Sequence, residues 1–331
     1  MSEKLSIAIP TYNRLAYLKE CISSILNQTF QDFSIFVFDN ASDEPIEEEL
    51  KKFNDKRIHF IGSDKNVGVM GNGIRILNYP FKSKYFMIFH DDDLMHPRML
   101  ELETSFLDRN NDIVFVGSNL NRVSDKSSYN FKKIRDSKIK YITYKNNYEF
   151  VKAIVSWLRL ACDSAMYKRE IIGNSRANFD RFSDLSDQAF LIEISKKGPC
   201  AFIDAPLVNY RIHPNQDSKL FKKSYEDGVL ETLSFCRENL PAVLNKSENK
   251  LFSKYSLNVL LYFYAHINGG FLDLLRFMKN CRQKKLVKYR YFRYIDAYGI
   301  TSLISIILRN KKIFNIARSF RDFFRKINEP R

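Results

Sequence analysis

The sequence predicts an α/β fold with a mixed, mostly parallel sheet that is flanked by helices and followed by a helical extension. Two observations lead to this prediction. Short apolar runs, typical of buried strands, alternate with amphipathic stretches of helical period over the first 220 residues. Polar residues then follow several of these runs, at the sheet edge where ligands of such folds bind.

Five apolar runs are the expected strands, at residues 5–10, 33–38, 57–62, 85–89 and 112–119. A helix is expected after the first strand, because its apolar residues fall on one face: Leu15, Leu18, Cys21, Ile22, Ile25 and Leu26. Acidic residues 44–49 suit the N-terminal dipole of the next helix.

The later part of the predicted sheet is less regular. Residues 120–150 are polar and are expected to form a surface hairpin or loop. Residues 150–172 are expected to be helical and then to return to the sheet through Asp163–Tyr167, and a further helix begins near Ser186. From about residue 222 the pattern is mostly helical.

Charge is unevenly distributed along the chain. Residues 221–331 hold 22 Lys and Arg against 9 Asp and Glu, a net charge of +13 out of +15 for the whole chain. We therefore expect an α/β domain over 1–220 and a basic, mainly helical region over 221–331. The basic region favours an anionic partner, such as membrane phosphates or nucleic acid.

The chain carries no sign of membrane insertion or of secretion. No run of about 18 uncharged apolar residues occurs, and the N-terminus lacks the features of a secretory signal. Its five cysteines are scattered and form no C-x-x-C pair. We therefore expect neither a zinc site nor a disulfide framework, and a reducing cytoplasm as the location.

Four polar segments lie at or just after expected strand ends: P-T-Y-N-R (10–14), D-N-A-S-D (39–43), K-N-V-G-V-M-G-N (65–72) and the triplet Asp91, Asp92 and Asp93. Each segment alone is compatible with an ordinary loop. Their occurrence in order at one edge of a sheet predicts a binding site. Three adjacent carboxylates there need solvation or a positive partner.

This ordered set resembles the family 2 glycosyltransferases with the GT-A fold, of the type that builds bacterial surface polysaccharides. The resemblance covers roughly residues 4–215 and includes the later segments S-D-Q-A-F and Y-R-I-H. It implies a catalytic domain over 1–220, with a nucleotide-binding half (1–100) and an acceptor half (101–220). The implied reaction moves one sugar from a nucleotide-diphosphate sugar to a hydroxyl, with inversion and with Mn²⁺ or Mg²⁺.

The resemblance assigns the aspartate triplet to the nucleotide and the metal. Asp91 would bind the nucleotide, and Asp92 would be the main ligand of the cation, which neutralises the diphosphate leaving group. Asp93 would hold the cation, the ribose or a water. The family more often has an aspartate where this chain has His90. Alternatively, the triplet is a solvated loop in which Asp93 caps a helix that starts at Leu94 to Pro97.

The resemblance also implies a nucleotide pocket. Asp39 would accept the imide N–H of the base, or it makes an Asx turn. The opposite wall would consist of Pro10, Thr11, Tyr12, Asn13 and Arg14, although Arg14 could instead cap the first helix. Asn66 and Gly68 would pack on the nucleotide, since glycine permits close approach of the backbone. Alternatively, that loop is a strand-to-helix turn with Asn72 exposed.

An acceptor hydroxyl needs a general base. The resemblance places it at Asp187, with Asp184 as second choice, and Asp187 would also suit the first turn of a helix. Arg211 or His213 could bind the diphosphate, His213 could complete the metal shell, or His213 is structural. The Q-x-x-R-W element of processive relatives is absent and the one tryptophan is Trp157, which favours transfer of a single sugar.

The basic C-terminal end has an amphipathic pattern over residues 301–328. Such a helix would lie on an anionic membrane, where each basic residue near the surface contributes about 1 kcal/mol to the binding free energy. Alternatively, it would pack on the catalytic domain. The membrane reading fits a lipid-linked glycan acceptor at the inner face of the plasma membrane, in O-antigen or capsule synthesis.

Two other functions are compatible with parts of the pattern. A sugar nucleotidyltransferase could share the sheet and acidic site, but would place a glycine-rich, basic loop after the first strand, where this chain has P-T-Y-N-R. A basic nucleic-acid-binding protein is less favoured, because the excess charge accompanies an apolar helical face. We therefore expect no nucleic-acid partner. For the donor, uridine is the preferred base, and thymidine and guanosine are the alternatives.

Overall fold

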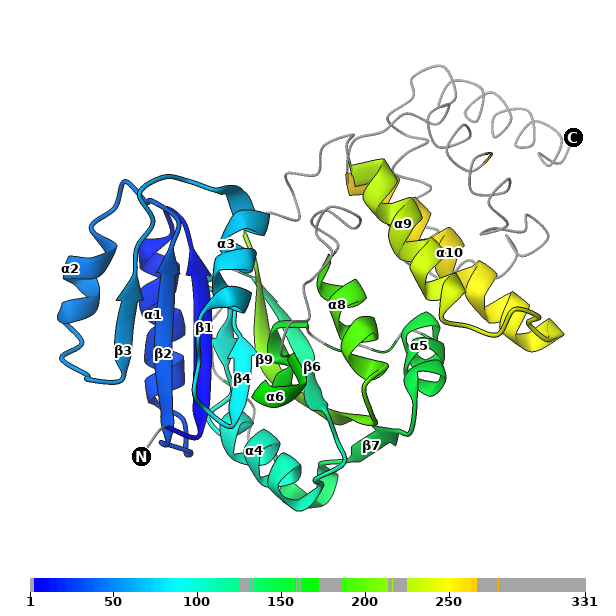
Figure 1. Cartoon of the computed structure of the whole chain (residues 1–331), viewed down its shortest axis with the longest axis horizontal. Helices are drawn as coiled ribbons and strands as arrows, with labels where there is room; N and C mark the ends of the chain where they lie inside the picture. Colours follow the sequence, from blue (N-terminus) through cyan, green and yellow to red (C-terminus); the bar gives the residue numbers. More distant parts are fainter. Residues whose placement is uncertain are drawn as a thin grey trace, which may run out of the picture. The chain divides into compact units, whose positions relative to one another are not determined.

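A computed structural model of the chain describes residues 3–124, 131, 134–156, 158, 160, 162–172, 186–213, 216, 225–266 and 279. The chain divides into two compact units (Figure 1). One unit consists of Met1–Ile154 and Leu158–His213, and the other of Val155–Trp157 and Pro214–Arg331. The first unit contains the sheet and the candidate site.

The first half of the sheet is parallel. Its strands are β1 (Leu5–Thr11), β2 (Phe33–Asp39), β3 (Ile58–Ile61) and β4 (Tyr85–Ile88), in the order β3-β2-β1-β4. β1 and β2 run in register from the pair Leu5 and Phe33 to the pair Thr11 and Asp39. Both strands are almost entirely buried, because helices cover both faces of a parallel sheet. The four strands predicted for this half of the sheet, at 5–10, 33–38, 57–62 and 85–89, are confirmed.

The second half makes the sheet mixed. It continues as β8-β6-β9-β5, through β8 (Met166–Lys168), β6 (Phe115–Ser124), β9 (Cys200–Ile212) and β5 (Leu94–Met95). β8 is antiparallel to both β4 and β6, whereas β9 is parallel to β6. A last strand, β7 (Tyr141–Tyr144), pairs with β9. The predicted fold class, a mixed and mostly parallel sheet with flanking helices, is confirmed.

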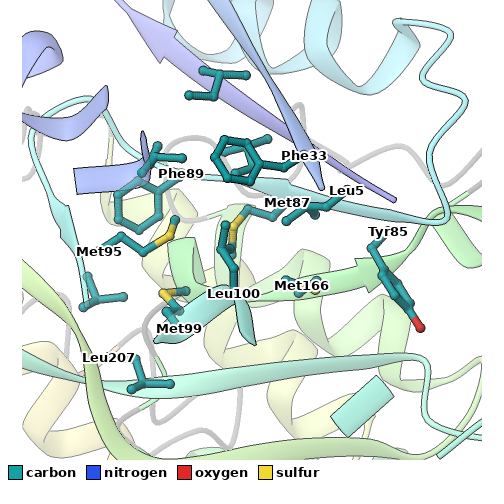
Figure 2. Packing of buried hydrophobic residues seen from close by; sticks show 14 of the residues in the cluster. Leu5, Phe33, Tyr85, Met87, Phe89, Met95, Met99, Leu100, Met166 and Leu207 are labelled. Atoms are coloured by element: carbon teal, nitrogen blue, oxygen red, sulfur yellow. The ribbon is translucent and has the colours of Figure 1, made fainter. Parts of the chain in front are cut away.

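Helices alternate with the strands of this unit. They are α1 (Leu15–Leu26), α2 (Ile46–Lys51), α3 (Gly68–Asn78), α4 (Met99–Arg109), α5 (Asn147–Val155), α6 (Arg169–Ile172) and α8 (Ser186–Ser195). α1 buries Leu18, Cys21, Ile22 and Ile25, which recur at helical spacing. Figure 2 shows the core against which such faces pack, where Leu5, Phe33, Met87 and Leu100 meet.

Three sequence predictions about the second half are wrong. Residues 120–150 are not simply a surface hairpin or loop, because they include the end of β6, all of β7 and the start of α5. The polar residues on either side of Y-I-T-Y (141–144) obscured β7. The helix expected over 150–172 ends at Val155, and the 3-10 turn η2 (Cys162–Ser164) comes later in that range. The predicted return to the sheet through Asp163–Tyr167 is confirmed by β8. Leu94 begins strand β5, not a helix.

The second unit contains two described helices, α9 (Tyr225–Glu238) and α10 (Lys246–His266). Both fall where the sequence predicts helix. No helix within the described parts of the chain is long and apolar enough to cross a membrane. The amphipathic segment predicted over residues 301–328 lies outside the described residues.

Candidate active site

The aspartate triplet follows β4 at the carboxyl end of the parallel strands. Asp91, Asp92 and Asp93 have only 3%, 8% and 1% of their surface exposed. Burial of three adjacent carboxylates is unfavourable unless positive or hydrogen-bonding groups compensate for the lost water. The triplet is therefore not a solvated loop, and its partners decide what the site can do.

Asp91 faces the loop after β1. Thr11 Oγ1 donates a hydrogen bond of 2.7 Å to Asp91 Oδ2, and Arg14 Nη1 lies 3.3 Å from Asp91 Oδ1. The same Arg14 nitrogen lies 3.5 Å from Asp92 Oδ2. Burial, together with the neighbouring charge of Asp92, raises the pKa of Asp91 to about 6 despite these two partners. Thr11, Arg14 and the triplet thus form one polar group.

Asp92 is contacted by His213, the residue that directly follows β9. His213 Nε2 lies 2.8 Å from Asp92 Oδ2, and His213 itself is buried. Burial alone would raise the pKa of Asp92, but the His213 hydrogen bond and the charges of His90 and Arg14 outweigh it and lower the pKa. The predicted proximity of Asp92 and His213 is therefore present.

Asp93 belongs to a second set of ligand-type atoms. The Arg211 backbone N–H donates a 2.7 Å hydrogen bond to Asp93 Oδ1, and Asp93 Oδ2 lies 4.0 Å from His90 Nδ1. His90, Asp93 and Asp163 each place one ligand atom within 4.8 Å of the others. The alternative in which Asp93 caps a helix is wrong, because strand β5 follows it.

Two oxygens in this set are suited to a cation. Asp93 Oδ2 and Asp163 Oδ2 are buried and accept no hydrogen bond from the residues that the structure describes. Burial and the charges of Asp163 and Asp92 raise the pKa of Asp93 well above its ordinary value. Hard divalent cations such as Mg²⁺ and Mn²⁺ prefer such carboxylate oxygens. The residues present therefore fit a divalent cation.

Asp163 is a site residue that the sequence analysis did not single out. It lies in η2 directly before β8, so the antiparallel return of that strand to β4 places it beside the triplet. Burial raises the pKa of Asp163, while the charge of His90 opposes that shift. An acidic residue just before an apolar strand segment was the available signal, but only the strand pairing shows where it lies.

Two loops at the carboxyl ends of β1 and β2 are tied to each other. Asn13 adopts a φ of 51° and takes part in three hydrogen bonds: its N–H donates to Ser42 Oγ at 2.9 Å, its Nδ2 donates to Asp43, and the Asp43 N–H donates back to Asn13 Oδ1. Ala41 has a φ of 62°, in the left-handed region that favours glycine. Tyr12 is 42% exposed beside these contacts, and Pro10 is half-buried.

Asp39 accepts hydrogen bonds from Ser42, three residues on, so it holds the following turn without forming the predicted Asx turn, which would join it to the N–H of residue 41. The Ser42 hydroxyl donates to Asp39 Oδ1 at 2.5 Å, and the Ser42 N–H lies 3.2 Å from Asp39 Oδ2. A carboxylate offers about four acceptor positions. These contacts fix the orientation of Asp39 and leave it acceptor capacity.

The loop before α3 is held by a residue that the sequence analysis passed over. Asn40 is buried; its Nδ2 donates to Asn66 Oδ1 at 3.0 Å and to the Gly68 carbonyl at 3.3 Å, and its Oδ1 accepts from the Val67 N–H at 2.9 Å. Gly68 has a φ of 75°, which requires glycine or strain.

One alternative expected Asn72 to be exposed, and this is wrong. It is 3% exposed and donates to the carbonyl of Phe38 at 2.9 Å. α3 thereby satisfies a backbone acceptor at the end of β2. This contact anchors the loop that carries Asn66 and Gly68.

Asp187 lies in the first turn of α8, as predicted, with an exposed side chain. Burial alone would lower the pKa of His90. The negative charges of Asp163, Asp187 and Asp92 outweigh burial and raise that pKa. Asp187 is therefore close enough to act electrostatically on the triplet's histidine. Asp184 and Trp157 lie outside the described residues.

A mixed sheet with buried acidic residues at its carboxyl edge, beside polar loops and a carboxylate at a helix start, is the arrangement expected of a GT-A transferase. The model of glycosyl transferase family 2 matches residues 6–174, about half of the chain. The chain therefore belongs to glycosyl transferase family 2.

Relatives and solved structures agree with this assignment. An uncharacterized glycosyltransferase of Haemophilus influenzae is 26% identical over 343 residues, which span 98% of this chain and 97% of the relative. A GalNAc(5)-diNAcBac-PP-undecaprenol beta-1,3-glucosyltransferase of Campylobacter jejuni is 38% identical over 93 residues, 27% of this chain and 29% of that protein.

The fold is that of S. aureus TarS. A crystal structure of its residues 1–349 in complex with UDP-GlcNAc has a TM-score of 0.54 and 15% sequence identity, and the match covers 80% of this chain and 81% of that one. At this identity the likeness shows the GT-A type of fold. Family membership and fold together make the chain a glycosyltransferase.

Proposed function

We propose that the chain is an inverting, metal-dependent, non-processive glycosyltransferase. It moves one sugar from a nucleotide-diphosphate sugar, with UDP-sugars preferred, to a hydroxyl of a glycan or lipid-linked glycan, in O-antigen or capsule synthesis. One observation carries this proposal. A buried group of carboxylates lies between Arg14 and Thr11 on one side and the end of β9, with His213, on the other.

The nucleotide would lie over the loops at the ends of β1 and β2. Asp39 would accept the imide N–H of uracil, with Ser42 holding its orientation. Thr11 and Asp91 would face the ribose and phosphates, and the lining residues would be Pro10, Tyr12, Asn13, Asn66 and Gly68. TarS, which has the same fold, was crystallised with UDP-GlcNAc and with UDP; this supports uridine as the base.

A divalent cation, Mn²⁺ or Mg²⁺, would neutralise the diphosphate and stabilise it as a leaving group. Asp92 and Asp93 are the proposed carboxylate ligands, and His213 is a third candidate because it already contacts Asp92. His90 and Asp163 surround the oxygen of Asp93 that accepts no hydrogen bond within the described structure, and they extend the candidate set on that side.

Asp187 would be the general base. Inversion requires the acceptor hydroxyl to attack from the side opposite the leaving group, and a carboxylate must then take its proton. Asp187 is exposed and charged at the start of α8, on the side of the site that includes His90. Its side chain is therefore accessible to an acceptor.

The acceptor is proposed from the charge and the sequence pattern of the C-terminal region, much of which lies outside the described residues. The basic surplus over residues 221–331 and the amphipathic pattern of 301–328 favour an anionic membrane surface. A lipid-linked glycan would be presented at such a surface, on the cytoplasmic face. The Campylobacter relative, which is named for an undecaprenol-linked substrate, supports this choice. We propose a peripheral association.

Thermal unfolding in the presence of UDP, GDP or TDP, each with and without Mn²⁺, tests the donor site. We expect UDP with Mn²⁺ to raise the unfolding temperature most. Asp187→Asn should keep that shift and lose transfer from UDP-sugars by a factor on the order of 10² or more. Full transfer by Asp187→Asn would exclude it as the base, and the lack of a shift with every nucleotide would exclude the proposed donor site.

A further inference from the structure

Arg14 is the side chain that lies between the first two aspartates of the triplet. Its Nη1 is 3.3 Å from Asp91 Oδ1 and 3.5 Å from Asp92 Oδ2. The Arg14 side chain is 16% exposed, and those of Asp91 and Asp92 are 3% and 12% exposed. The guanidinium therefore supplies positive charge at a place where water is largely excluded.

We propose that Arg14 is an exchangeable counter-ion: it neutralises Asp91 and Asp92 while the site is empty and moves onto the donor's diphosphate when a divalent cation binds Asp92. The proposal rests on the function proposed above, and it adds an order to binding. The cation alone binds weakly, and the cation and the nucleotide diphosphate strengthen each other.

The physical reason is competition for one carboxylate. A divalent cation that binds Asp92 Oδ2 would lie within a few ångströms of the Arg14 guanidinium, and like charges at that distance repel strongly where water is excluded. A diphosphate removes the conflict, because it offers oxygens to both cations. Coupling of this kind is reciprocal, so each ligand must tighten the other by the same factor.

The position of Arg14 suits a movement of this kind. It is the N-cap residue of α1, with φ −139° and ψ 36°, and it makes no side-chain cap to that helix. Arg14 occupies the N-cap position, but the prediction that its side chain caps the first helix is wrong. The N–H of Leu15 is satisfied by Glu44 at 2.8 Å instead. Because neither the cap nor the first helical N–H depends on the guanidinium, its side chain can change rotamer without unwinding α1.

A fixed Arg14 would have the opposite effect on metal affinity. If the guanidinium only held Asp91 and Asp92 in place, its removal would loosen the ligands and weaken cation binding. If it competes, its removal should strengthen cation binding. The sign of the change in the absence of nucleotide therefore separates the two roles.

The experiment measures the dissociation constant of Mn²⁺ from the full chain by the electron paramagnetic resonance signal of the free ion, with and without UDP. In wild type we expect UDP to tighten Mn²⁺ binding strongly. In Arg14→Gln we expect Mn²⁺ alone to bind on the order of tenfold more tightly, and the effect of UDP to shrink by a similar factor.

Lys19→Gln is the matched control. Lys19 lies on the same helix, is 46% exposed at its side chain, and its substitution removes the same charge, but its partner is Glu49 of α2 at 2.8 Å. It should leave both Mn²⁺ constants within about twofold of wild type. Arg14→Lys, which keeps the charge, should keep weak binding of Mn²⁺ alone, and it provides the test if Arg14→Gln does not fold.

The outcomes separate this inference from the proposed function. Weaker or unchanged binding of Mn²⁺ alone by a folded Arg14→Gln, in a protein whose wild type binds Mn²⁺ and UDP together, would overturn the counter-ion role only. Tighter binding by Arg14→Lys than by wild type would also overturn it. Absence of any joint binding in wild type would overturn the donor site, and the inference with it.

Discussion

His213 and Asp92 are 121 residues apart in the chain, and their side chains meet at 2.8 Å between Nε2 and Oδ2. The Tyr17 ring lies 4.6 Å from the His213 ring and 4.6 Å from the Arg211 guanidinium carbon. Arg211 in turn forms a 2.6 Å ion pair with Glu20. One face of α1, with Tyr17 and Glu20, therefore fixes the end of β9 against the triplet.

The first prediction concerns His213. His213→Gln removes an imidazole that both orients Asp92 and is a candidate ligand. We expect Mn²⁺ affinity in the presence of UDP to fall about 10- to 100-fold, as measured by calorimetric titration. His59→Gln, on the exposed side of the edge strand β3, is the control. Unchanged Mn²⁺ affinity in His213→Gln would remove the residue from the site.

A second prediction isolates the role of Tyr17. Tyr17→Phe keeps the ring against His213 and Arg211, and should retain Mn²⁺ and UDP binding. Tyr17→Leu removes the aromatic face and should weaken that binding several-fold, at about 0.5–1.5 kcal/mol for an aromatic contact. Equal loss in both variants would show that the hydroxyl matters and not the stacking.

Asn40 provides a third prediction. Asn40→Ala removes the hydrogen bonds that Asn40 makes to the Val67 N–H and to the Gly68 carbonyl. It also removes one of the two donors to Asn66 Oδ1, which keeps the Gly68 N–H. We expect a loss of about 1–3 kcal/mol in the free energy of unfolding, and weaker UDP binding, because the loop that carries Asn66 and Gly68 is no longer held. Asn78→Ala, at the exposed end of α3, should leave both quantities unchanged.

Calorimetric titration and denaturant unfolding of the two variants measure these changes. A loss of stability in Asn40→Ala with full UDP affinity would show that the loop is not part of the nucleotide pocket. That outcome would leave the fold intact and would withdraw Asn66 and Gly68 from the proposed site.

Glu103 gives a prediction on pH. It is fully buried on α4, and both of its carboxylate oxygens lack hydrogen-bond partners among the described residues. Burial, with a smaller contribution from Asp163, raises its pKa well above the ordinary value of 4.5. The folded protein therefore keeps a proton that the unfolded chain has lost, so Glu103 destabilises the fold increasingly as pH rises above about 4.5.

Glu103→Gln removes that dependence and keeps the shape. The variant should match wild type below pH 4.5 and become the more stable protein above it, by at most about 1.4 kcal/mol for each pH unit until the folded carboxyl ionises. Urea unfolding of both proteins between pH 4 and pH 8 measures the difference. A constant difference over that range would show that Glu103 does not hold a proton in the fold.

The strands of the first half of the sheet could be predicted because each is a continuous apolar run, such as residues 33–38, bounded by polar loop residues. β7 could not, because its strand-favouring residues Y-I-T-Y number only four and lie within a polar segment of the sequence. A strand of two residues such as β5 is too short for any periodicity.

The same limit applies to the site. Asp91 to Asp93 and His213 could be proposed from motifs that lie at strand ends. Asp163 and Asn40 could not, because their importance depends on which backbone groups and carboxylates come near them after folding. Asp163 is near the triplet only through the antiparallel pairing of β8 with β4, and local sequence does not encode that pairing.

The most direct test titrates UDP into wild type and into Asp92→Asn, each with Mn²⁺ and with a chelator. Our account predicts that wild type binds UDP tightly only with Mn²⁺, and that Asp92→Asn, which removes a ligand charge, loses at least about 10²-fold in that affinity. UDP binding by Asp92→Asn that equals wild type, or wild-type binding that does not change with the chelator, would contradict it.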